Sequence, residues 1–435
     1  MLLGAIADDF TGATDLCSML VRGGMRTVQL IGVPSPDPPA PDADAVVVAL
    51  KSRTAPVRQA IEESLAALNW LQAAGARQYF FKYCSTFDST EQGNIGPVAD
   101  ALIAALECGF ALACPAFPTN ARTVYQGHLF VGGNLLNESG MEHHPLTPMT
   151  DANLVRVLSR QTDGTVGLVP FVTVDEGAHA IRDAMTQLKE RGRRYAIVDA
   201  ITDAHLVAIG EAASSHALIT GGSGVAMGLP GNFRRMEMLP EGIDPGALPS
   251  VAGPAAVIAG SCSRATLAQL GYARAHLPVF ELHALAIPDT AVPDAGAPDA
   301  GALSEAALAW AADKIGDKPV VIAASAPPEK VAELQSRLGR EQAGTLIEDA
   351  VARVAHGLVA RGVRKFVVAG GETSGAVVGR LGVRSLRIGA EIDPGVPWTF
   401  AEGSGPDLML ALKSGNFGAT DFFLKAFRVL EGGPR

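Results

Sequence analysis

The sequence lacks the features that mark several large protein classes. Its five cysteines form no Cys-x-x-Cys pair and no cluster with histidine at zinc-ligand spacing, which favours buried, reduced thiols. Acidic residues number 45 against 35 basic ones, a net charge of −10, whereas a nucleic-acid-binding surface needs a basic face. No charged-then-apolar leader and no apolar run of membrane-spanning length is present. We therefore expect a cytoplasmic protein with neither nucleic acid nor membrane as a partner.

Two familiar nucleotide-binding signatures are absent as well. No Gly-x-x-x-x-Gly-Lys-Ser/Thr occurs, so the chain is not a P-loop enzyme. No Gly-x-Gly-x-x-Gly follows the first predicted strand, and Gly222-Ser223-Gly224 lacks the third glycine at the required spacing. A Rossmann dinucleotide site is therefore disfavoured.

The chain does have a regular alternation of apolar runs and longer amphipathic segments, which indicates βαβ units and parallel sheets. Its 435 residues exceed the usual size of one core, so two domains are expected. We predict an α/β fold of two domains, residues 1–235 and 250–435, each with a mostly parallel sheet flanked by helices. The break lies in the Pro- and Gly-rich stretch Phe233–Pro254. Two further low-complexity stretches, Pro34–Ala43 and Ile287–Gly301, are predicted loops.

The predicted elements have these ranges. Strands are expected at 28–33, 46–50, 78–82, 111–114, 196–199, 217–220, 255–260, 279–282, 320–323, 365–369 and 408–412, and helices include 57–74, 177–191, 263–275 and 343–361.

The first apolar run ends in two adjacent carboxylates, Asp8 and Asp9, followed by Thr11 and Gly12. A buried parallel strand reads as a continuous apolar run, and ligands bind at the carboxyl ends of such strands. Two neighbouring like charges also need hydrogen bonds, a cation or a substrate to offset them. Either Asp9 or Thr11 could simply cap the following helix.

Cations and hydroxyl groups follow other predicted strands of the first half. Lys51, Arg53 and Lys82 could hold a carboxylate, Arg53 with bidentate geometry. Together with the two aspartates they predict a pocket for a polyhydroxy acid, with His128 as a weaker candidate contact. The remaining candidate substrate residues are Ser85, Asp88, Ser89, Asn94, Gly222 and Ser223.

Three strand–turn–helix segments of the second half carry glycines and hydroxyls that suit the phosphates of a nucleotide. After residue 369, two glycines allow a tight turn and close approach to a ligand, and Thr373 or Ser374 is expected to cap a helix whose N-terminus favours an anion. A turn near Gly260 has the same strand–turn–helix arrangement. At residues 415–418 we expect a third site, in which backbone N–H groups form an anion-binding concavity. The candidate nucleotide residues are Ser261, Ser263, Gly370, Gly371, Glu372, Thr373, Ser374, Gly375, Gly415 and Asn416.

These segments together resemble the four-carbon acid sugar kinase family. The resemblance rests on Asp8–Ala13, Lys51–Arg53, Asp88–Thr90, Gly93–Gly96, Gly221–Gly224, Gly260–Ser263, Gly370–Gly375 and Lys413–Gly418, in order along nearly the whole chain. It implies an N-terminal substrate domain, a C-terminal nucleotide domain and an active site in the cleft between them. Within the family, Lys82–Thr90 looks most like the 3-oxo-tetronate 4-kinases, because threonate and erythronate kinases tend to carry a shorter Lys-x-x-Asp-Ser-Thr version.

The resemblance implies transfer of the ATP γ-phosphoryl group to the C4 hydroxyl of 3-oxo-tetronate, with ATP at Ser261, the Gly370–Gly375 loop and Gly415. Asp88, Asp8 and Asp9 are, in that order, candidates for the general base. Mg²⁺ could use Glu372, although the metal ligands stay undetermined. Threonate and erythronate 4-kinases are the main alternatives, a nicotinamide-dependent dehydrogenase or a non-catalytic sugar-acid sensor is less favoured, and a homodimer is left open.

Overall fold

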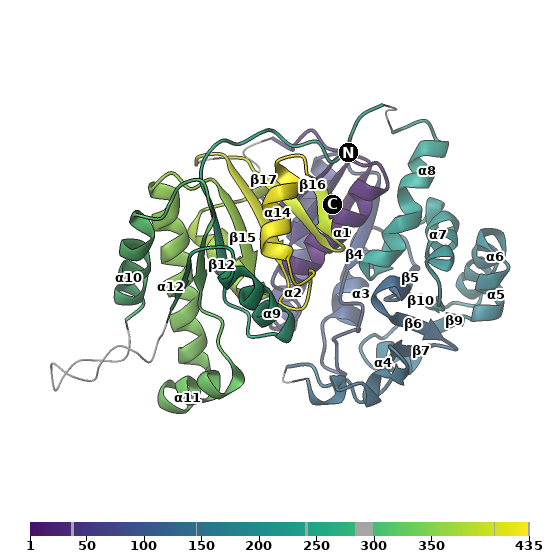
Figure 1. Cartoon of the computed structure of the whole chain (residues 1–435). Coiled ribbons are helices and arrows are strands. Elements are labelled where there is room, and N and C mark those ends of the chain that lie inside the picture. The colour runs from purple at the N-terminus through teal and green to yellow at the C-terminus, as the bar shows by residue number, and fades with distance from the viewer. Residues whose placement is uncertain (36–38, 145, 240–241, 283–298, 404, 434–435) are drawn as a thin grey trace. The chain divides into compact units, whose positions relative to one another are not determined.

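A computed structural model describes residues 1–35, 39–144, 146–239, 242–282, 299–403 and 405–433 (Figure 1). The chain forms two compact units, Met1–Gly246 and Ala247–Arg435. Parts of the two predicted low-complexity loops, residues 36–38 and 287–298, lie outside the described residues, as do residues 283–286.

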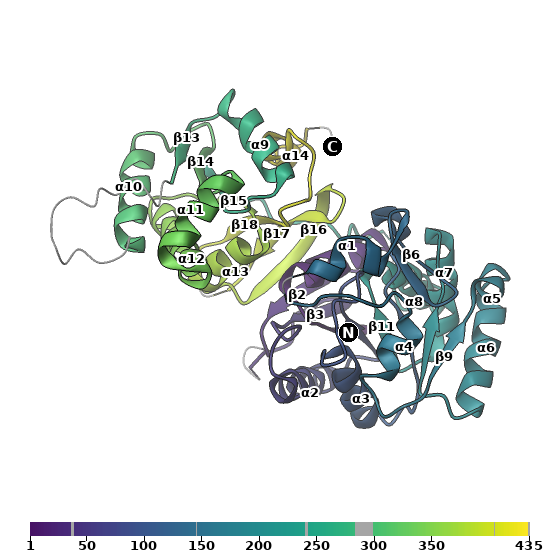
Figure 2. The same cartoon turned by 90° about the horizontal axis from the view of Figure 1, so that it is seen from below.

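The N-terminal unit is built on a parallel sheet with the strand order β2-β3-β1-β4-β11-β5-β10-β9. Figure 2 shows α2 and α3 on one face of this sheet and α1, α7 and α8 on the other. A short antiparallel ribbon, β6-β7-β8, follows β5. The strands are β1 Leu3–Ala7, β2 Thr27–Ile31, β3 Ala45–Ala49, β4 Gln78–Lys82, β5 Ala111–Cys114, β6 Arg122–Tyr125, β7 His128–Val131, β8 Asn134–Leu135, β9 Val166–Val169, β10 Tyr195–Val198 and β11 Leu218–Gly221. The helices are α1 Phe10–Arg22, α2 Val57–Ala73, α3 Ile95–Ala105, α4 Leu154–Ser159, α5 Phe171–Asp175, α6 Ala178–Glu190, α7 Asp203–Ala212 and α8 Leu229–Arg235.

The central strands of this sheet are buried on both faces, which explains their continuous apolar sequences. Every residue of β1 and of β3 is buried. Because helices cover both sides, no position on these strands has to be polar. After the apolar runs of β1 and β3, polar residues therefore begin where each strand ends, at the carboxyl edge of the sheet.

The C-terminal unit has the strand order β13-β14-β12-β15-β18-β17-β16. The first five strands are parallel, whereas β17 pairs antiparallel with both β18 and β16. The strands are β12 Ala255–Ala259, β13 Val279–Glu281, β14 Val320–Ala323, β15 Lys365–Ala369, β16 Ser385–Asp393, β17 Val396–Ala401 and β18 Leu408–Lys413. The helices are α9 Arg264–Arg274, α10 Ala300–Ala312, α11 Pro328–Leu338, α12 Arg340–Ala360, α13 Gly371–Arg380 and α14 Phe422–Leu430.

Helices also cover both faces of the second sheet. Figure 2 shows α9 and α14 on one face and α12 and α13 on the other. The phenylalanines of α14 and the apolar side chains of α9 pack on alternate strand residues, including Val257, Val367 and Met409. The predicted α/β class with a mostly parallel sheet in each unit is thus confirmed; the antiparallel pair β16–β17 was not predicted.

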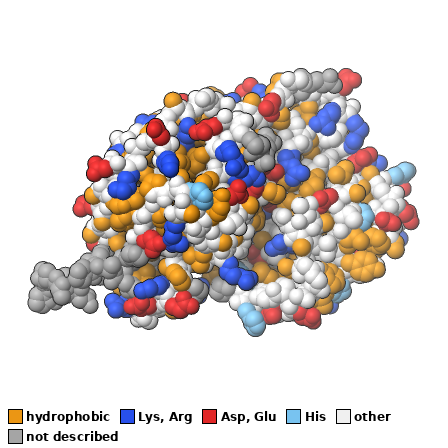
Figure 3. All heavy atoms as spheres, viewed as in Figure 1, with side chains coloured by type: hydrophobic (Ala, Val, Ile, Leu, Met, Phe, Trp, Pro, Cys, Tyr) orange, Lys and Arg blue, Asp and Glu red, His pale blue; other side chains and the backbone are white. Residues whose placement is uncertain are grey.

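The charged side chains and the helix lengths can be compared with the expectations for nucleic-acid and membrane partners. On the face shown in Figure 3, described acidic and basic side chains are interspersed, without a continuous basic stripe. Within the described parts of the chain, every helix is too short or too polar to span a lipid bilayer.

Candidate functional site

In the N-terminal unit, the polar segments gather at one edge of the sheet. The neighbouring strands β3, β1, β4 and β11 run parallel, so the residues that follow them lie at their shared carboxyl ends. Asp8, Arg53, Lys82 and Gly222 are each at or within a few residues of such an end. The sequence pattern predicted this shared edge correctly.

Arg53 organises the acidic residues at this edge. Its Nε and Nη2 donate to the two carboxylate oxygens of Asp8 at 2.9 and 2.8 Å, and Nη2 also donates to Asp9 Oδ1 at 2.6 Å. Nη1 lies 3.8 Å from Asp88 Oδ2. One guanidinium therefore faces three carboxylates, two of them adjacent in sequence, and offsets the repulsion between them.

Burial and charge act in opposite directions on these groups. Burial raises the pKa of Asp8, against the nearby Arg53 charge. Burial would also raise the pKa of Asp9, but Arg53, Lys82 and hydrogen bonds from Thr11 and Gly12 outweigh it, so this pKa is lowered. Burial would lower the pKa of Arg53, but Asp8 and Asp9 reverse the effect and raise it well above its ordinary value. The guanidinium consequently stays charged.

Asp9 also begins helix α1. It is the N-cap residue, accepting the backbone N–H of Gly12 at 3.2 Å and the Thr11 hydroxyl at 2.8 Å. Of the two predicted capping residues, the structure selects Asp9. Gly12 is required here, because a Cβ would overlap Asp9 Oδ1 and lie 2.8 Å from Lys82 Nζ.

The two lysines at this edge differ in burial. Lys82, the last residue of β4, is only 3% exposed, and its ammonium donates to the Tyr83 carbonyl at 2.8 Å. Lys51 is exposed and makes no hydrogen bond or ion pair with a described residue. Lys51 is therefore free to bind an anion, and the buried Lys82 ammonium makes only one hydrogen bond with a described residue, so it keeps donors for an anion as well.

Asp88 is the least engaged of the three carboxylates. Its Oδ1 accepts the Thr86 hydroxyl at 2.6 Å, and its Oδ2 is near Arg53 without a hydrogen bond. Thr86 also contacts Cys84 Sγ at 2.9 Å. Burial and the Asp88 charge raise the pKa of Cys84 to about 11, so this thiol stays protonated at neutral pH. Cys84 lines the site without being a nucleophile.

Ser89 and Asn94 support the site from behind. The Ser89 hydroxyl donates to Gln161 Oε1 at 2.9 Å, and Asn94 Nδ2 donates to the Ser52 and Ala55 carbonyls at 2.7 and 2.8 Å. Asn94 therefore holds the loop that carries Arg53. Ser85 is half-buried and makes no hydrogen bond with a described residue.

The remaining candidate residues of this unit, Gly222, Ser223 and His128, make contacts elsewhere in the unit. Ser223 donates to Asp15 on α1, and a Cβ on Gly222 would lie 2.7 Å from the Pro115 carbonyl. Both ring nitrogens of His128 are engaged, by the Gln126 carbonyl at 2.8 Å and by Asn153 at 3.3 Å. These residues shape the unit, and none of these contacts joins them to the Arg53 cluster.

The predicted glycine turns of the C-terminal unit also meet at one edge, after the parallel strands β12, β15 and β18. A Cβ on Gly260 would overlap Thr373 Oγ1, and a Cβ on Gly415 would overlap Ser261 Oγ. Gly370 has a φ of 129°, which a side chain rarely allows. The three turns pack so closely that only glycine fits at these positions.

Helix α13 begins without the predicted hydroxyl cap. Its N-cap is Gly370, no side chain caps it, and Thr373 and Ser374 lie within its first turn. The prediction was wrong because Gly370 turns the chain from β15 into the helix in a single residue. The first N–H groups of α13 have no intrahelical partner, so this N-terminus can bind an anion. Helix α9, in contrast, is capped by Ser263, as expected.

The strand-end residue Lys413 was not among the candidates. Its side chain is fully buried, and its Nζ donates to Thr266 Oγ1 at 3.1 Å and to the Ser414 and Gly415 carbonyls at 3.0 and 3.1 Å. The sequence did contain a signal that the Lys413 side chain is buried. Alternate residues of a strand share a face, and Met409 and Ala411, four and two positions earlier, pack in the core.

A cavity of about 940 Å³ opens beside the glycine turns. Gly260, Glu372 and Thr373 line one part of it, and apolar residues of α11 and α12, among them Leu334 and Ile347, line another. Glycine turns beside an apolar wall suit a nucleotide, with its phosphates at the turns and its base against the wall. The apolar wall was not predicted.

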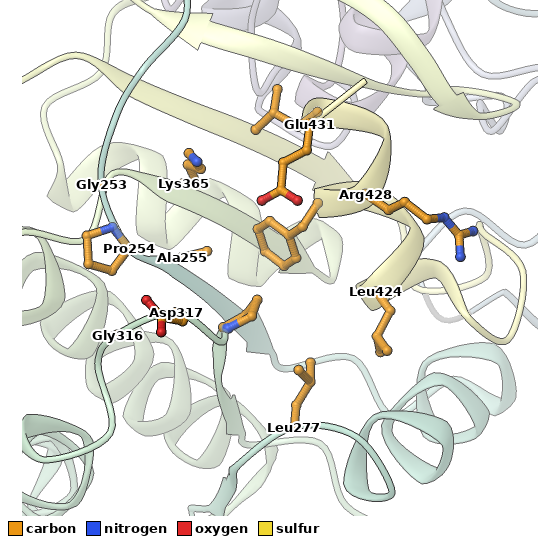
Figure 4. A pocket seen from close by; sticks show the side chains of 13 residues that line it. Gly253, Pro254, Ala255, Leu277, Gly316, Asp317, Lys365, Leu424, Arg428 and Glu431 are labelled. Atoms are coloured by element: carbon orange, nitrogen blue, oxygen red, sulfur yellow. The ribbon is translucent and has the colours of Figure 1, made fainter. Parts of the chain in front are cut away.

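A second cavity of this unit, about 580 Å³, lies at the opposite edge of the sheet, by the first residues of β12 and β15 (Figure 4). In Figure 4 the Glu431 carboxylate extends into it, while the Arg428 guanidinium points away. Gly253 and Gly316 line it at the amino ends of the strands, whereas ligands of such sheets bind at the carboxyl ends. The 940 Å³ cavity is therefore the nucleotide candidate.

Comparison with known proteins covers both units. Residues 3–229 match the model of a sugar-binding N-terminal domain, and residues 256–423 match that of a nucleotide-binding C-terminal domain. A curated 3-oxo-tetronate kinase of Burkholderia multivorans is 58% identical, covering 99% of this chain and 98% of its own. One of Cupriavidus necator is 56% identical, with the same coverage.

The chain belongs to the four-carbon acid sugar kinase family.

Solved structures agree with this assignment. A crystal structure from Salmonella typhimurium LT2 is 43% identical, with a TM-score of 0.88 over 98% of this chain and 99% of that one. A structure from Haemophilus influenzae is 41% identical, with a TM-score of 0.81 over 98% and 100%. The Salmonella structure was described as a tRNA synthase, whereas a curated relative from Salmonella typhimurium, 44% identical over 99% of each chain, is named 3-oxo-tetronate kinase.

The kinase assignment fits the residues of the C-terminal unit. The chain is a kinase and uses ATP. Glycines whose Cβ atoms would overlap neighbouring hydroxyls, together with the uncapped α13, are the candidate residues for binding the phosphate groups. Within the described residues, no group of three or more metal-binding side chains gathers. The residues thus suit a cation held mainly by phosphate oxygens, with Glu372 as one exposed carboxylate near the turns.

Proposed function

We propose that this kinase transfers the γ-phosphoryl group of ATP to the C4 hydroxyl of 3-oxo-tetronate. Full-length curated relatives at 56–58% identity carry the name 3-oxo-tetronate kinase. The observation that carries the proposal in the structure is the Arg53 cluster. It combines three carboxylates with a buried lysine and a free lysine, as a hydroxylated acid requires.

The proposal assigns the sugar acid to residues 1–235 and ATP to residues 250–435. The Arg53 cluster supports the first assignment, and the glycine turns with their cavity support the second. Phosphoryl transfer needs positioning and neutralisation of charge more than covalent chemistry. Both bound substrates must therefore be in contact during turnover.

Asp88 is the proposed general base. Both oxygens of Asp8 are held by Arg53, and Asp9 is held by Arg53, Thr11 and the helix start. Only Asp88 keeps an oxygen, Oδ2, without a hydrogen bond to a described residue. That oxygen can accept the proton of the attacking C4 hydroxyl.

The substrate carboxylate is assigned to Lys51 and Lys82. Arg53 was a candidate for this role, but its guanidinium already donates to Asp8 and Asp9. We propose that Arg53 positions the carboxylates instead. Ser85, which has no hydrogen bond to a described residue, is assigned to a substrate hydroxyl.

Mg²⁺ belongs to the proposal as a partner of the triphosphate, where it neutralises phosphate charge. Glu372 is its proposed protein ligand, directly or through water. A cytoplasmic location is part of the proposal, and use of ATP supports it.

The test is an ATP-coupled screen of the purified chain with 3-oxo-tetronates, D- and L-threonate and D-erythronate, followed by identification of the phosphorylated carbon. We expect the highest kcat/KM with a 3-oxo-tetronate and phosphate on C4. A higher kcat/KM with threonate or erythronate would assign the chain to the alternative activity of the same family. Substrate-dependent reduction of NAD without ATP consumption would contradict the kinase.

A further inference from the structure

The buried end of β18 has a specific effect on the nucleotide turn. Lys413 Nζ donates to the carbonyl oxygens of Ser414 and Gly415, and the Gly415 carbonyl also accepts the hydroxyls of Ser263 and Thr266 at 2.6 and 2.9 Å. Both carbonyls are therefore held toward the Lys413 side chain.

The orientation of these carbonyls fixes the next two amides. In a trans peptide, the N–H points opposite to the C=O of the preceding residue. The N–H groups of Gly415 and Asn416 consequently point away from Lys413, and neither donates to a described residue. Successive amides on one side of a turn form an anion-binding concavity. Lys413 thus prepares a phosphate site that it does not itself occupy.

The charge of Lys413 is not balanced by a side chain of the described residues. The elements around it offer no partner: β17 has no charged residue, Lys365 is at the other end of β15, and Arg264 and Glu372 are exposed. The buried carboxylate of Asp393, at the end of β16, is already paired with Lys425 at 2.6 Å and accepts the backbone N–H of Ala419. A buried cation without a counter-charge is costly, and burial alone lowers the pKa of Lys413 to about 8. A bound polyphosphate would supply the missing negative charge.

We propose that Lys413 is the positioning residue of the nucleotide site, turning the amides of Gly415 and Asn416 toward the phosphates and becoming fully protonated when they bind. This inference rests on the proposed function, because it assumes that the C-terminal unit binds ATP. Its distinguishing consequence is that nucleotide binding takes up a proton, which a purely structural lysine would not cause.

The first experiment measures that proton in the wild-type chain. Mg-ADP is titrated by calorimetry at pH 8 in buffers of different protonation enthalpy. Since the phosphate has its last pKa at about 6 and is already ionised, the proton must come onto the protein. We expect an uptake of about half a proton per ADP at pH 8, and binding about five- to tenfold weaker at pH 9 than at pH 7.5.

Single-residue variants identify the side chain that takes up the proton. Cys262 lies in the adjacent turn and carries a free thiol, so Cys262→Ser is included and should keep the uptake. Lys413→Met should lose it and bind ADP at least about tenfold more weakly, which is about 1.4 kcal/mol. Lys413→Arg restores a permanent charge, so it should recover part of the affinity without the pH dependence. Lys365→Met, at the other end of β15, is the matched control and should bind ADP as wild type does.

The outcomes separate the inference from the function beneath it. No binding of ADP by folded wild-type chain would contradict the proposed function. Wild-type binding without proton uptake, or uptake that persists in Lys413→Met, would overturn the role of Lys413. If Lys413→Met fails to fold, as judged by circular dichroism, proton uptake is measured in Lys413→Arg instead. Loss of the uptake in that variant would support the role of Lys413, and persistence would overturn it.

Discussion

The two candidate sites solve the problem of buried charge in opposite ways. In the N-terminal unit, three carboxylates surround one guanidinium, and the ion pairs are complete without a substrate. In the C-terminal unit, the turns consist of glycines, hydroxyls and a helix N-terminus, and among the described residues Lys413 has only uncharged oxygen partners. The difference matches the ligands: a hydroxylated acid needs a base and local acceptors, whereas a triphosphate needs amides and unopposed positive charge.

The same contrast applies to preorganisation. Arg53 fixes its carboxylates through short, charge-assisted hydrogen bonds, so the acidic site is rigid before substrate arrives. The nucleotide site is shaped instead by close backbone approach, as the glycine contacts at Gly260 and Gly415 show. A substitution should therefore act through charge in the first unit and through volume in the second.

The largest expected effect tests the acidic site. Asp88→Asn removes the proposed base while keeping its size, and kcat should fall by about 10²–10⁴. Mg-ADP binding should stay unchanged, since the contacts of Asp88 lie in the other unit. Steady-state kinetics measure the first and calorimetry the second. Asp163→Asn, a substitution at an exposed aspartate of the same unit, is the control. A fall in kcat of less than about tenfold would remove Asp88 as the base.

The next effect tests the nucleotide site by volume. Gly415→Ala introduces a Cβ that would overlap Ser261 Oγ, so the KM for ATP should rise by about tenfold or more while the KM for the sugar acid stays near the wild-type value. Gly379→Ala on α13 is the matched control, because a Cβ there has nothing within 4 Å. Equal KM values for ATP in the two variants would mean that the turn is not part of the nucleotide site.

The parts of each site that the sequence predicted are those set by local rules. Asp9 as a helix cap, Ser263 as another, and the tight turn at Gly370 follow from short-range backbone chemistry. The shared edge of the strands follows from the βαβ alternation, because parallel strands end on the same side.

What the sequence did not predict depends on pairings between distant residues. Arg53 is 45 positions from Asp8, and its commitment to Asp8 and Asp9 rather than to a ligand depends on loop geometry. The cavity wall of α11 and α12 could not be inferred either, since Leu334 and Ile347 look like ordinary residues of amphipathic helices. The antiparallel β16–β17 pair was missed for the same reason: nothing local distinguishes it from a parallel strand.

A smaller effect concerns stability. Arg53→Met leaves three carboxylates without their cation and should lower the free energy of unfolding by about 2–4 kcal/mol, since the pair is largely buried. Without Arg53, burial should hold the folded-state pKa values of Asp8 and Asp9 above their unfolded values, so the folded state binds more protons and the variant loses stability as pH rises. We expect urea melts to show a smaller loss at pH 5 than at pH 8. A loss independent of pH would mean that the guanidinium acts only through packing.

The smallest expected effect is a difference in alkylation between Cys84, in the acidic site, and Cys262, beside the nucleotide turns. Burial and the Asp88 charge raise the pKa of Cys84 to about 11, and the side chain is half-buried, so it should resist alkylation in the native chain. Cys262 is exposed and lines the 940 Å³ cavity, so a thiol reagent should reach it, and Mg-ADP should protect it. Peptide mapping after brief iodoacetamide treatment measures the labelling of both cysteines.

Cys84→Ser should change kcat by less than about threefold, because a protonated thiol takes no part in proton transfer to Asp88. Rapid labelling of Cys84 in the folded chain would show that the acidic site opens to solvent. The contrast between an acidic site closed by complete ion pairs and an open nucleotide site, in which Lys413 has no charged partner among the described residues, would then be wrong.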